Sequence, residues 1–162
     1  MENLKWFSEG SKFSLKNGDE TIMKLSINLA GESICNINDR EYQIYKKGAW
    51  NSLYYVFADG QEIARLCHGI WGSSGKIAFA DGAEYNVAYR SKDGFKIRFM
   101  DEENEILEYG VVIMGIRTTM KFKVGISMID AEKLLLLAAL GMIIFFPILK
   151  EITGGTDGDM LF

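Results

Sequence analysis

The side chains on which catalytic and metal sites are most often built are scarce in this chain of 162 residues. There is one histidine, His68, and there are two cysteines, Cys35 and Cys67. A zinc site needs three or four ligands, and a disulfide framework normally needs more than two cysteines. The sequence therefore predicts no metal site, no cofactor and no disulfide scaffold.

The adjacent Cys67 and His68 suggest a thiol–imidazole pair, but neighbouring residues of a strand point to opposite faces. We expect a buried thiol beside a surface imidazole. Trp71–Gly75 lacks the Gly-Lys-Ser ending of a phosphate loop, and we expect a hairpin or connecting loop there. Asp101–Glu105, close to Glu108, predicts a solvated acidic turn rather than a carboxylate pair for hydrolysis. No enzymatic activity is predicted.

An excess of positive charge is also missing. The chain has 22 acidic and 18 basic residues and a formal net charge of −4, whereas nucleic-acid binders usually carry a basic surface. No nucleic-acid partner is therefore predicted. The first residues, Met1–Lys5, lack the basic-then-apolar order of a secretory signal, so we expect a cytoplasmic protein. A composition of 48% hydrophobic and 25% charged residues is that of a globular protein.

A two-residue period of apolar side chains runs from Trp6 to about Met128 and indicates half-buried strands. The abundance of aromatic residues and the single proline favour strands as well. The individual strands predicted are Met23–Leu29, Tyr42–Tyr45, Leu53–Phe57, Ile63–Leu66, Ile77–Phe79, Tyr85–Tyr89, Phe95–Phe99, Val111–Ile116 and Met120–Met128. Roughly eleven to thirteen short strands in all are too many for a comfortable open sheet, so we predict a mainly β, antiparallel closed barrel of about twelve strands.

Asn-Gly and Asp-Gly pairs, which tolerate the positive φ of tight hairpins, separate the strands. They are Asn17-Gly18, Asp59-Gly60, Asp81-Gly82 and Asp93-Gly94. An odd-length loop at Lys92–Gly94 would place Arg90 opposite Lys96 and keep the apolar residues on one face. The same parity gives the pairs Phe57–Ile63 and Phe79–Tyr85.

Basic residues then project outwards from neighbouring strands. The five candidate lipid-binding residues are Arg90, Lys96, Arg98, Lys121 and Lys123. An anionic headgroup could bind such a cluster, although outward lysine and arginine side chains often serve solubility alone.

Leu134–Leu149 contains sixteen residues without a polar side chain and is preceded by Asp130 as a plausible N-cap. A membrane-spanning helix needs about 20 apolar residues, and Pro147 shortens this one further. A helix that is apolar all round must be buried in lipid or in protein, and a barrel of this size needs its interior filled. We favour a central helix at about residues 131–149 over a tail anchor that spans a membrane.

Asp-Gly hairpins with aromatic strands, followed by the stretch Ile129–Met142 (IDAEKLLLLAALGM), resemble the tubby C-terminal-like superfamily. That group includes the tubby-like, the LURP-one-related and the phospholipid scramblase proteins. The resemblance covers about Ile22 to Leu149 and implies a twelve-stranded barrel wrapped around a hydrophobic C-terminal helix. Tubby-like proteins bind phosphoinositide headgroups through basic surface residues, so lipid binding is what the resemblance implies. Scramblases carry an acidic calcium-binding segment, whereas Asp101–Glu105 lacks the ligand spacing and glycine of an EF-hand loop.

We therefore predict one domain over residues 1–153 and a flexible acidic tail at 154–162. The domain is predicted to be a non-enzymatic cytoplasmic binding module, peripheral to a membrane if its partner is an anionic phospholipid headgroup. A protein partner is the other possibility, and a small-molecule substrate is not expected because the helix fills the lumen. The alternatives are a tail-anchored protein with Leu134–Leu149 in the bilayer and a scramblase-like lipid protein.

Overall fold

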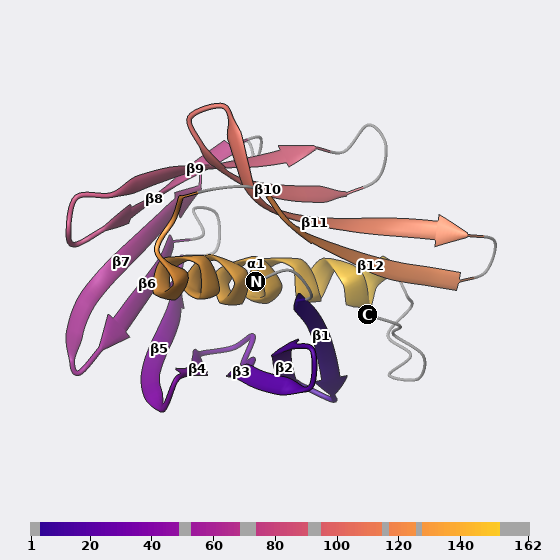
Figure 1. Ribbon diagram of the computed structural model, residues 1–162, viewed down its shortest axis with the longest axis horizontal. Helices are drawn as coiled ribbons and strands as arrows, with labels where there is room; N and C mark the ends of the chain where they lie inside the picture. The colour runs from indigo at the N-terminus through magenta and orange to yellow at the C-terminus, as the bar shows by residue number, and fades with distance from the viewer. Residues whose placement is uncertain are drawn as a thin grey trace.

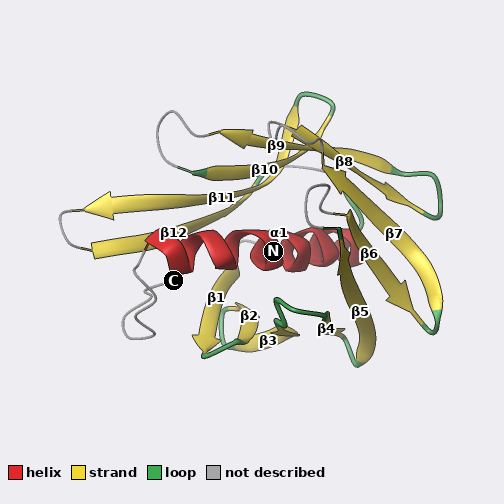
Figure 2. Cartoon of the chain, turned by 180° about the vertical axis from the view of Figure 1, so that it is seen from behind, coloured by secondary structure: helices red, strands yellow, loops and turns green. Residues whose placement is uncertain are grey.

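The structure, a computed structural model, describes residues 4–48, 53–68, 74–90, 95–114, 117–125 and 128–152. These residues form twelve β-strands followed by one α-helix (Figures 1 and 2). The strands are β1 (Leu4–Glu9), β2 (Lys12–Asn17), β3 (Glu20–Ser26), β4 (Glu32–Ile37), β5 (Arg40–Lys47), β6 (Leu53–Ala58), β7 (Gln61–His68), β8 (Ser74–Phe79), β9 (Glu84–Arg90), β10 (Lys96–Asp101), β11 (Asn104–Met114) and β12 (Arg117–Val124), and the helix is α1 (Ala131–Ile152). The predicted tail at 154–162, the Asp93-Gly94 pair and residues 71–73 of the predicted loop lie outside the described residues.

One antiparallel sheet contains all twelve strands, and each strand pairs with the next along the chain. The sheet curls into a nearly closed barrel around α1, so the predicted fold class is confirmed (Figure 1). In the described part of the chain no backbone ladder joins β1 to β12. Side chains close this junction, because the rings of Trp6 on β1 and Phe122 on β12 lie 6.2 Å apart. We call the junction between β1 and β12 the seam.

The antiparallel order places successive connections at alternate ends of the barrel. The connections that follow even-numbered strands, including the β4–β5 and β8–β9 turns, lie at the end where α1 begins (Figure 1). The connections that follow odd-numbered strands lie at the opposite end, where α1 ends. We call these two ends the N-rim and the C-rim. A helix of 22 residues is about 33 Å long and therefore reaches from one rim to the other.

The register predicted for β9 and β10 is confirmed, because Arg90 opposes Lys96. The described apolar side chains of this hairpin face the core, where some are fully and others partly buried. They are Tyr85, Val87, Tyr89, Phe95, Ile97 and Phe99. The outward direction of the intervening residues follows from this pattern.

The same loop parity is wrong for two other hairpins. In β6–β7, Phe57 opposes Glu62 rather than Ile63. The β6–β7 turn holds only two residues, both with positive φ, and a β-bulge in the hairpin then restores the inward alternation. In β8–β9, Tyr85 opposes Ile77 rather than Phe79. Bulges as well as loop lengths therefore set the register of this barrel.

Helix α1 begins where the sequence predicts and ends three residues later than expected. The backbone N–H of Glu132 donates to Oδ1 of Asp130 at 2.7 Å, which caps the first turn. Ala138, Gly141 and Met142 are buried, as expected for a central helix. By length and composition α1 could cross a membrane, but 67% of its most apolar stretch is buried inside the barrel. The barrel therefore supplies the apolar surroundings that such a helix needs.

Tyr109 on β11 connects the seam to the helix. Its hydroxyl donates to the carbonyl oxygen of Ala138 at 2.7 Å and accepts from Nε1 of Trp6 at 3.0 Å. The Tyr109 ring lies against Gly141, where an added Cβ would meet it at less than contact distance. One buried tyrosine thus fixes the position of the helix relative to β1 and β11.

Ion pairs hold the first turn of α1 at the N-rim. Glu132 accepts from the Tyr42 hydroxyl at 2.6 Å and from Arg40 at 3.2 Å. Lys133 forms an ion pair with Asp81 in the β8–β9 turn. Because these residues bind the helix from two separate hairpins, they have a structural role at this end of the barrel.

Candidate anion-binding surface

Strand pairing brings the five basic residues predicted from the sequence onto one continuous face of β9–β12. Two neighbouring cross-strand rows contain them, namely Arg90–Lys96–Gly110–Lys121 and Arg98–Glu108–Lys123. Lys121 and Lys123 are exposed, and Lys96 and Arg98 are partly buried. The side chain of Arg90 lies outside the part that the structure describes. The predicted cluster is therefore a spatial neighbourhood, but it also contains a carboxylate.

That carboxylate belongs to Glu108, which is only 4% exposed although it lies on the outer face. Arg98 donates from Nε to Oε2 of Glu108 at 2.7 Å, and Lys96 approaches Oε1 at 3.5 Å. Burial by itself raises the pKa of Glu108, but the hydrogen bond from Arg98 and the charge of Lys96 outweigh it and leave the pKa below its usual value. Arg98 also forms an ion pair with Glu105, Nε to Oε2 at 3.4 Å, so these two carboxylates together offset the charges of Lys96 and Arg98.

Four lysines that the sequence analysis did not single out lie across the seam, on β1–β3. They are Lys5, Lys12, Lys16 and Lys24. In β2 and β3 they alternate with buried residues such as Phe13 and Leu25, so they project outwards. Within the described ranges none of the four forms an ion pair. This period-two pattern was the signal that could have identified them.

Like charges face each other on this part of the sheet. Lys5 lies directly opposite Lys16 in the β1–β2 ladder. Directly opposed like charges destabilise a sheet, and no described carboxylate forms an ion pair with either lysine. An external anion would relieve this repulsion.

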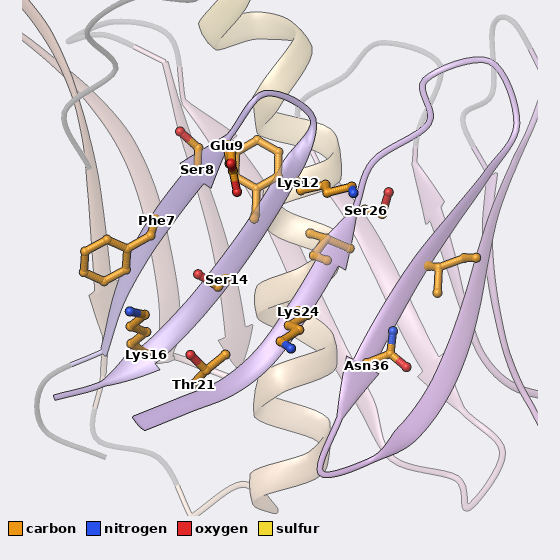
Figure 3. Close-up of a pocket in the computed structure, with 13 residues that line it drawn as sticks. Phe7, Ser8, Glu9, Lys12, Ser14, Lys16, Thr21, Lys24, Ser26 and Asn36 are labelled. Carbon is orange, nitrogen blue, oxygen red and sulfur yellow. The ribbon is translucent and has the colours of Figure 1, made fainter. Parts of the chain in front are cut away.

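A shallow groove of about 550 Å³ runs over the outer face of β1–β4 (Figure 3). Phe7 borders it and is 46% exposed, and the Lys16 ammonium lies 4.8 Å from the centre of the Phe7 ring. Figure 3 shows Phe7 and Lys16 at one side of the groove and Lys24 further along the sheet, with α1 behind the strands. Glu9, opposite Lys12, is the acidic residue in the lining. The groove therefore offers ammonium groups and an exposed aromatic ring on one surface.

The expectation for Cys67 and His68 is reversed in the structure. Cys67 is exposed, whereas His68 points inwards and is partly buried. The buried Leu66 two residues earlier sets this phase, since inward positions of a strand recur every second residue. The Tyr89 hydroxyl is hydrogen-bonded to Nδ1 of His68, and burial lowers the pKa of His68 to about 4. The two side chains point apart, so they form no thiol–imidazole pair.

Among the residues that the structure describes, no group of three histidine, cysteine, aspartate or glutamate side chains could hold a metal ion. Asp101 and the next three residues form the β10–β11 turn, and all four are exposed. No protein-family model, curated protein or solved structure matches the chain. The resemblance to the tubby C-terminal-like superfamily therefore stays a prediction.

Proposed function

We propose that this protein is a non-enzymatic cytoplasmic barrel that docks on anionic membranes through its outer face at the seam. The docking surface consists of β12 on one side of the seam and β1–β3 on the other. The observation that carries the proposal is the set of outward lysines without an ion pair among described residues. These are Lys5, Lys12, Lys16, Lys24, Lys121 and Lys123.

The exposed ring of Phe7 supports a membrane rather than a soluble anion as the partner. Peripheral membrane proteins combine basic side chains, which are attracted to the lipid headgroups, with aromatic side chains that enter the interface. Phe7 and Lys16 provide this combination on adjacent strands.

The net charge of −4 determines how the barrel would approach the membrane. Much of the acidic charge lies on other strands and turns, where it pairs with basic residues as in Arg65–Glu62 and Lys76–Glu84. An anionic surface repels those faces and attracts the lysines at the seam. Docking should therefore occur in one orientation and should weaken as salt screens the attraction.

The burial of α1 favours this peripheral arrangement over a tail anchor. Leu137, Leu140 and Phe145 are fully buried by the strands around them. Extracting α1 into a bilayer would replace these contacts with lipid but leave the barrel without its core. The same helix fills the lumen, so a substrate site inside the barrel is not proposed.

The test is co-sedimentation with vesicles of phosphatidylcholine alone and of phosphatidylcholine containing phosphatidylserine. The first variant reverses three groove lysines to glutamate: Lys12→Glu, Lys16→Glu and Lys24→Glu. Each basic residue near an anionic membrane contributes about 1 kcal/mol, so the triple reversal should weaken binding about a hundredfold or more.

A second triple variant controls for net charge. Lys47→Glu, Arg65→Glu and Lys76→Glu change the charge by the same amount on the far strands β5–β8. We expect this variant to bind much more tightly than the groove variant. Phe7→Ser should weaken the binding that remains at high salt, where apolar contact dominates. Negligible binding of the wild type to both vesicles, or equal losses in the two triple variants, would contradict the proposal.

A further inference from the structure

A small pocket opens at the C-rim, between the second half of α1 and strands β4–β6. Its volume is about 150 Å³. Its lining includes Leu29, Ile44, Lys46, Tyr54, Ile143 and Pro147. The pocket lies beside the helix at the rim, so it exists although α1 fills the lumen. It is separate from the lysine groove, which is on the outside of β1–β4.

The lining is mainly apolar, and the side-chain oxygens of its polar residues Asn28 and Ser33 already accept hydrogen bonds from backbone N–H groups. Ile44 and Ile143 are buried in the core and present their surfaces to the cavity, and Leu29 at its edge is 50% exposed. A cavity of about 150 Å³ accommodates a molecule the size of benzene, or about six carbon atoms.

One end of the pocket carries a positive charge. In β5 the inward positions are those of Tyr42 and Ile44, and by the two-residue period Lys46 takes the next one. Lys46 lies opposite Tyr54 and is exposed at the rim, and within the described chain it has no ion pair. An inward-facing ammonium at the mouth of an apolar pocket is suited to an anionic head with an apolar body.

His68 lies next to this positive end. Its ring packs edge-on against Tyr54, with the ring centres 5.6 Å apart. Burial, and to a smaller extent the positive charge of Lys46, lower the pKa of His68 to about 4. The charged and titratable groups described around His68 are therefore Lys46 on β5, Tyr54 on β6 and Tyr89 on β9.

We propose that this pocket binds a small monocarboxylate with an apolar body of about six carbon atoms. The carboxylate pairs with the Lys46 ammonium, and the carbon chain lies against Ile44, Ile143 and Pro147. The Tyr54 side chain forms the wall between the bound molecule and His68. This inference does not depend on membrane docking, because none of these residues belongs to the lysine groove.

The single histidine of the chain makes the test direct. The probe is hexanoate, followed by NMR of the His68 ring resonances in the full chain. Saturable shifts of these resonances are expected, together with a rise in the pKa of His68, because a nearby carboxylate stabilises the imidazolium. 1-Hexanol supplies the same chain without the charge, and inorganic phosphate supplies an anion without the chain. Both should bind at least about tenfold more weakly than hexanoate.

Two matched variants locate the charge that binds the carboxylate. Lys46→Met should weaken hexanoate binding at least about tenfold and leave the affinity for 1-hexanol unchanged. Lys47→Met removes the neighbouring charge, which points to the outer face and stacks on Tyr55, and should bind hexanoate like the wild type. Both positions are exposed, so both variants should fold normally. The proposal is overturned if hexanoate causes no saturable shift, if 1-hexanol binds equally well, or if the two variants behave alike.

Discussion

Replacing Gly141 by alanine should destabilise the protein, although alanine is the better helix former. An added Cβ would lie 2.8 Å from Cδ2 of Tyr109, closer still to Cε2 of that ring, and 3.1 Å from Cε2 of Phe99. Carbon atoms attract one another best at about 3.5–4.0 Å, so these separations are repulsive. The Tyr109 ring cannot retreat freely, because its hydroxyl is bonded to both Trp6 and Ala138.

Three contributions determine how much Gly141→Ala changes the free energy of unfolding. Overpacking a core costs about 1–3 kcal/mol, and displacing Tyr109 from two buried hydrogen bonds costs about 1 kcal/mol for each. The higher helix propensity of alanine returns about 1 kcal/mol. Gly141→Ala should therefore lower the free energy of unfolding by about 2–4 kcal/mol. For a chain of this length, that change lowers Tm by roughly 4–16 °C.

Urea and thermal unfolding measured by circular dichroism test this expectation. Gly110→Ala is the matched control, because its Cβ would lie 3.6 Å from Cγ of Lys96, an ordinary contact, and its stability should change little. Combining Gly141→Ala with Tyr109→Leu removes the clashing ring, so the two substitutions should cost less together than the sum of their separate effects. A Gly141→Ala protein as stable as the wild type, or more stable, would refute the packing argument.

Two further outcomes concern titratable groups. Glu108→Gln should lower the free energy of unfolding at pH 7, measured by urea titration, by about 2 kcal/mol, because it removes the buried charge partner of Arg98. Glu84→Gln is the control, because Glu84 and its partner Lys76 are both exposed. It should change the free energy of unfolding by less than about 1 kcal/mol. Folding lowers the pKa of Glu108. The wild type should therefore be more stable than Glu108→Gln above the unfolded pKa of about 4.3, and this difference in the free energy of unfolding should disappear as pH falls through the folded pKa. The pKa of His68 is also lowered, from about 6.5 in the unfolded chain to about 4 in the folded protein. The stability that the buried neutral imidazole contributes is therefore fully present above pH 6.5 and is lost as pH falls towards 4. His68→Gln should therefore show a smaller loss of stability than the wild type between pH 6.5 and pH 4, and identical slopes would contradict the assignment.

The sequence predicts the architecture because it contains both a barrel and the helix that fills it. Alternating strands with Asn-Gly and Asp-Gly turns imply more strands than an open sheet holds comfortably, and the apolar helix Leu134–Leu149 must be surrounded by apolar groups. The alternation does not show where each strand begins. Strand β11 starts at Asn104 rather than Val111, because a bulge places Ile106 and Leu107 both in the core and breaks the period. Bulges of this kind depend on the partner strand and cannot be seen in one segment alone.

The candidate surface shows a similar limit. Alternation correctly predicts the outward direction of Lys96 and Arg98, but their neutralisation depends on Glu108, which is ten or more residues away in the sequence. Whether Arg98 faces Glu108 is decided by the β10–β11 register, which includes the same bulge. The groove lysines were missed for another reason. Lys12 and Lys16 lie in β2, a six-residue strand with few apolar positions, and they matter only because β1 and β3 bring further lysines beside them.

The two cysteines provide a test of whether α1 stays in the barrel when the protein meets a membrane. Cys35 on β4 is fully buried in the core that α1 completes, and burial raises the pKa of its thiol to about 12, so it should not react with a maleimide. Cys67 is exposed and should react at once. Mass spectrometry should find one adduct on the native protein and two in guanidinium chloride. If unfolding costs at least about 5 kcal/mol, opening of the core slows labelling of Cys35 more than about a thousandfold.

Cys67→Ser isolates the buried thiol and makes the comparison sharper. A helix that remains in the barrel leaves this variant without an adduct, both in buffer and on phosphatidylserine vesicles. A helix that inserts into the bilayer removes the core against which β4 packs, so Cys35 becomes accessible although no denaturant is present. Labelling of Cys35 on vesicles but not in buffer would therefore contradict peripheral docking and identify Leu134–Leu149 as a membrane anchor. Equal protection in both conditions is the outcome expected, because leaving the barrel would expose the inward apolar faces of twelve strands.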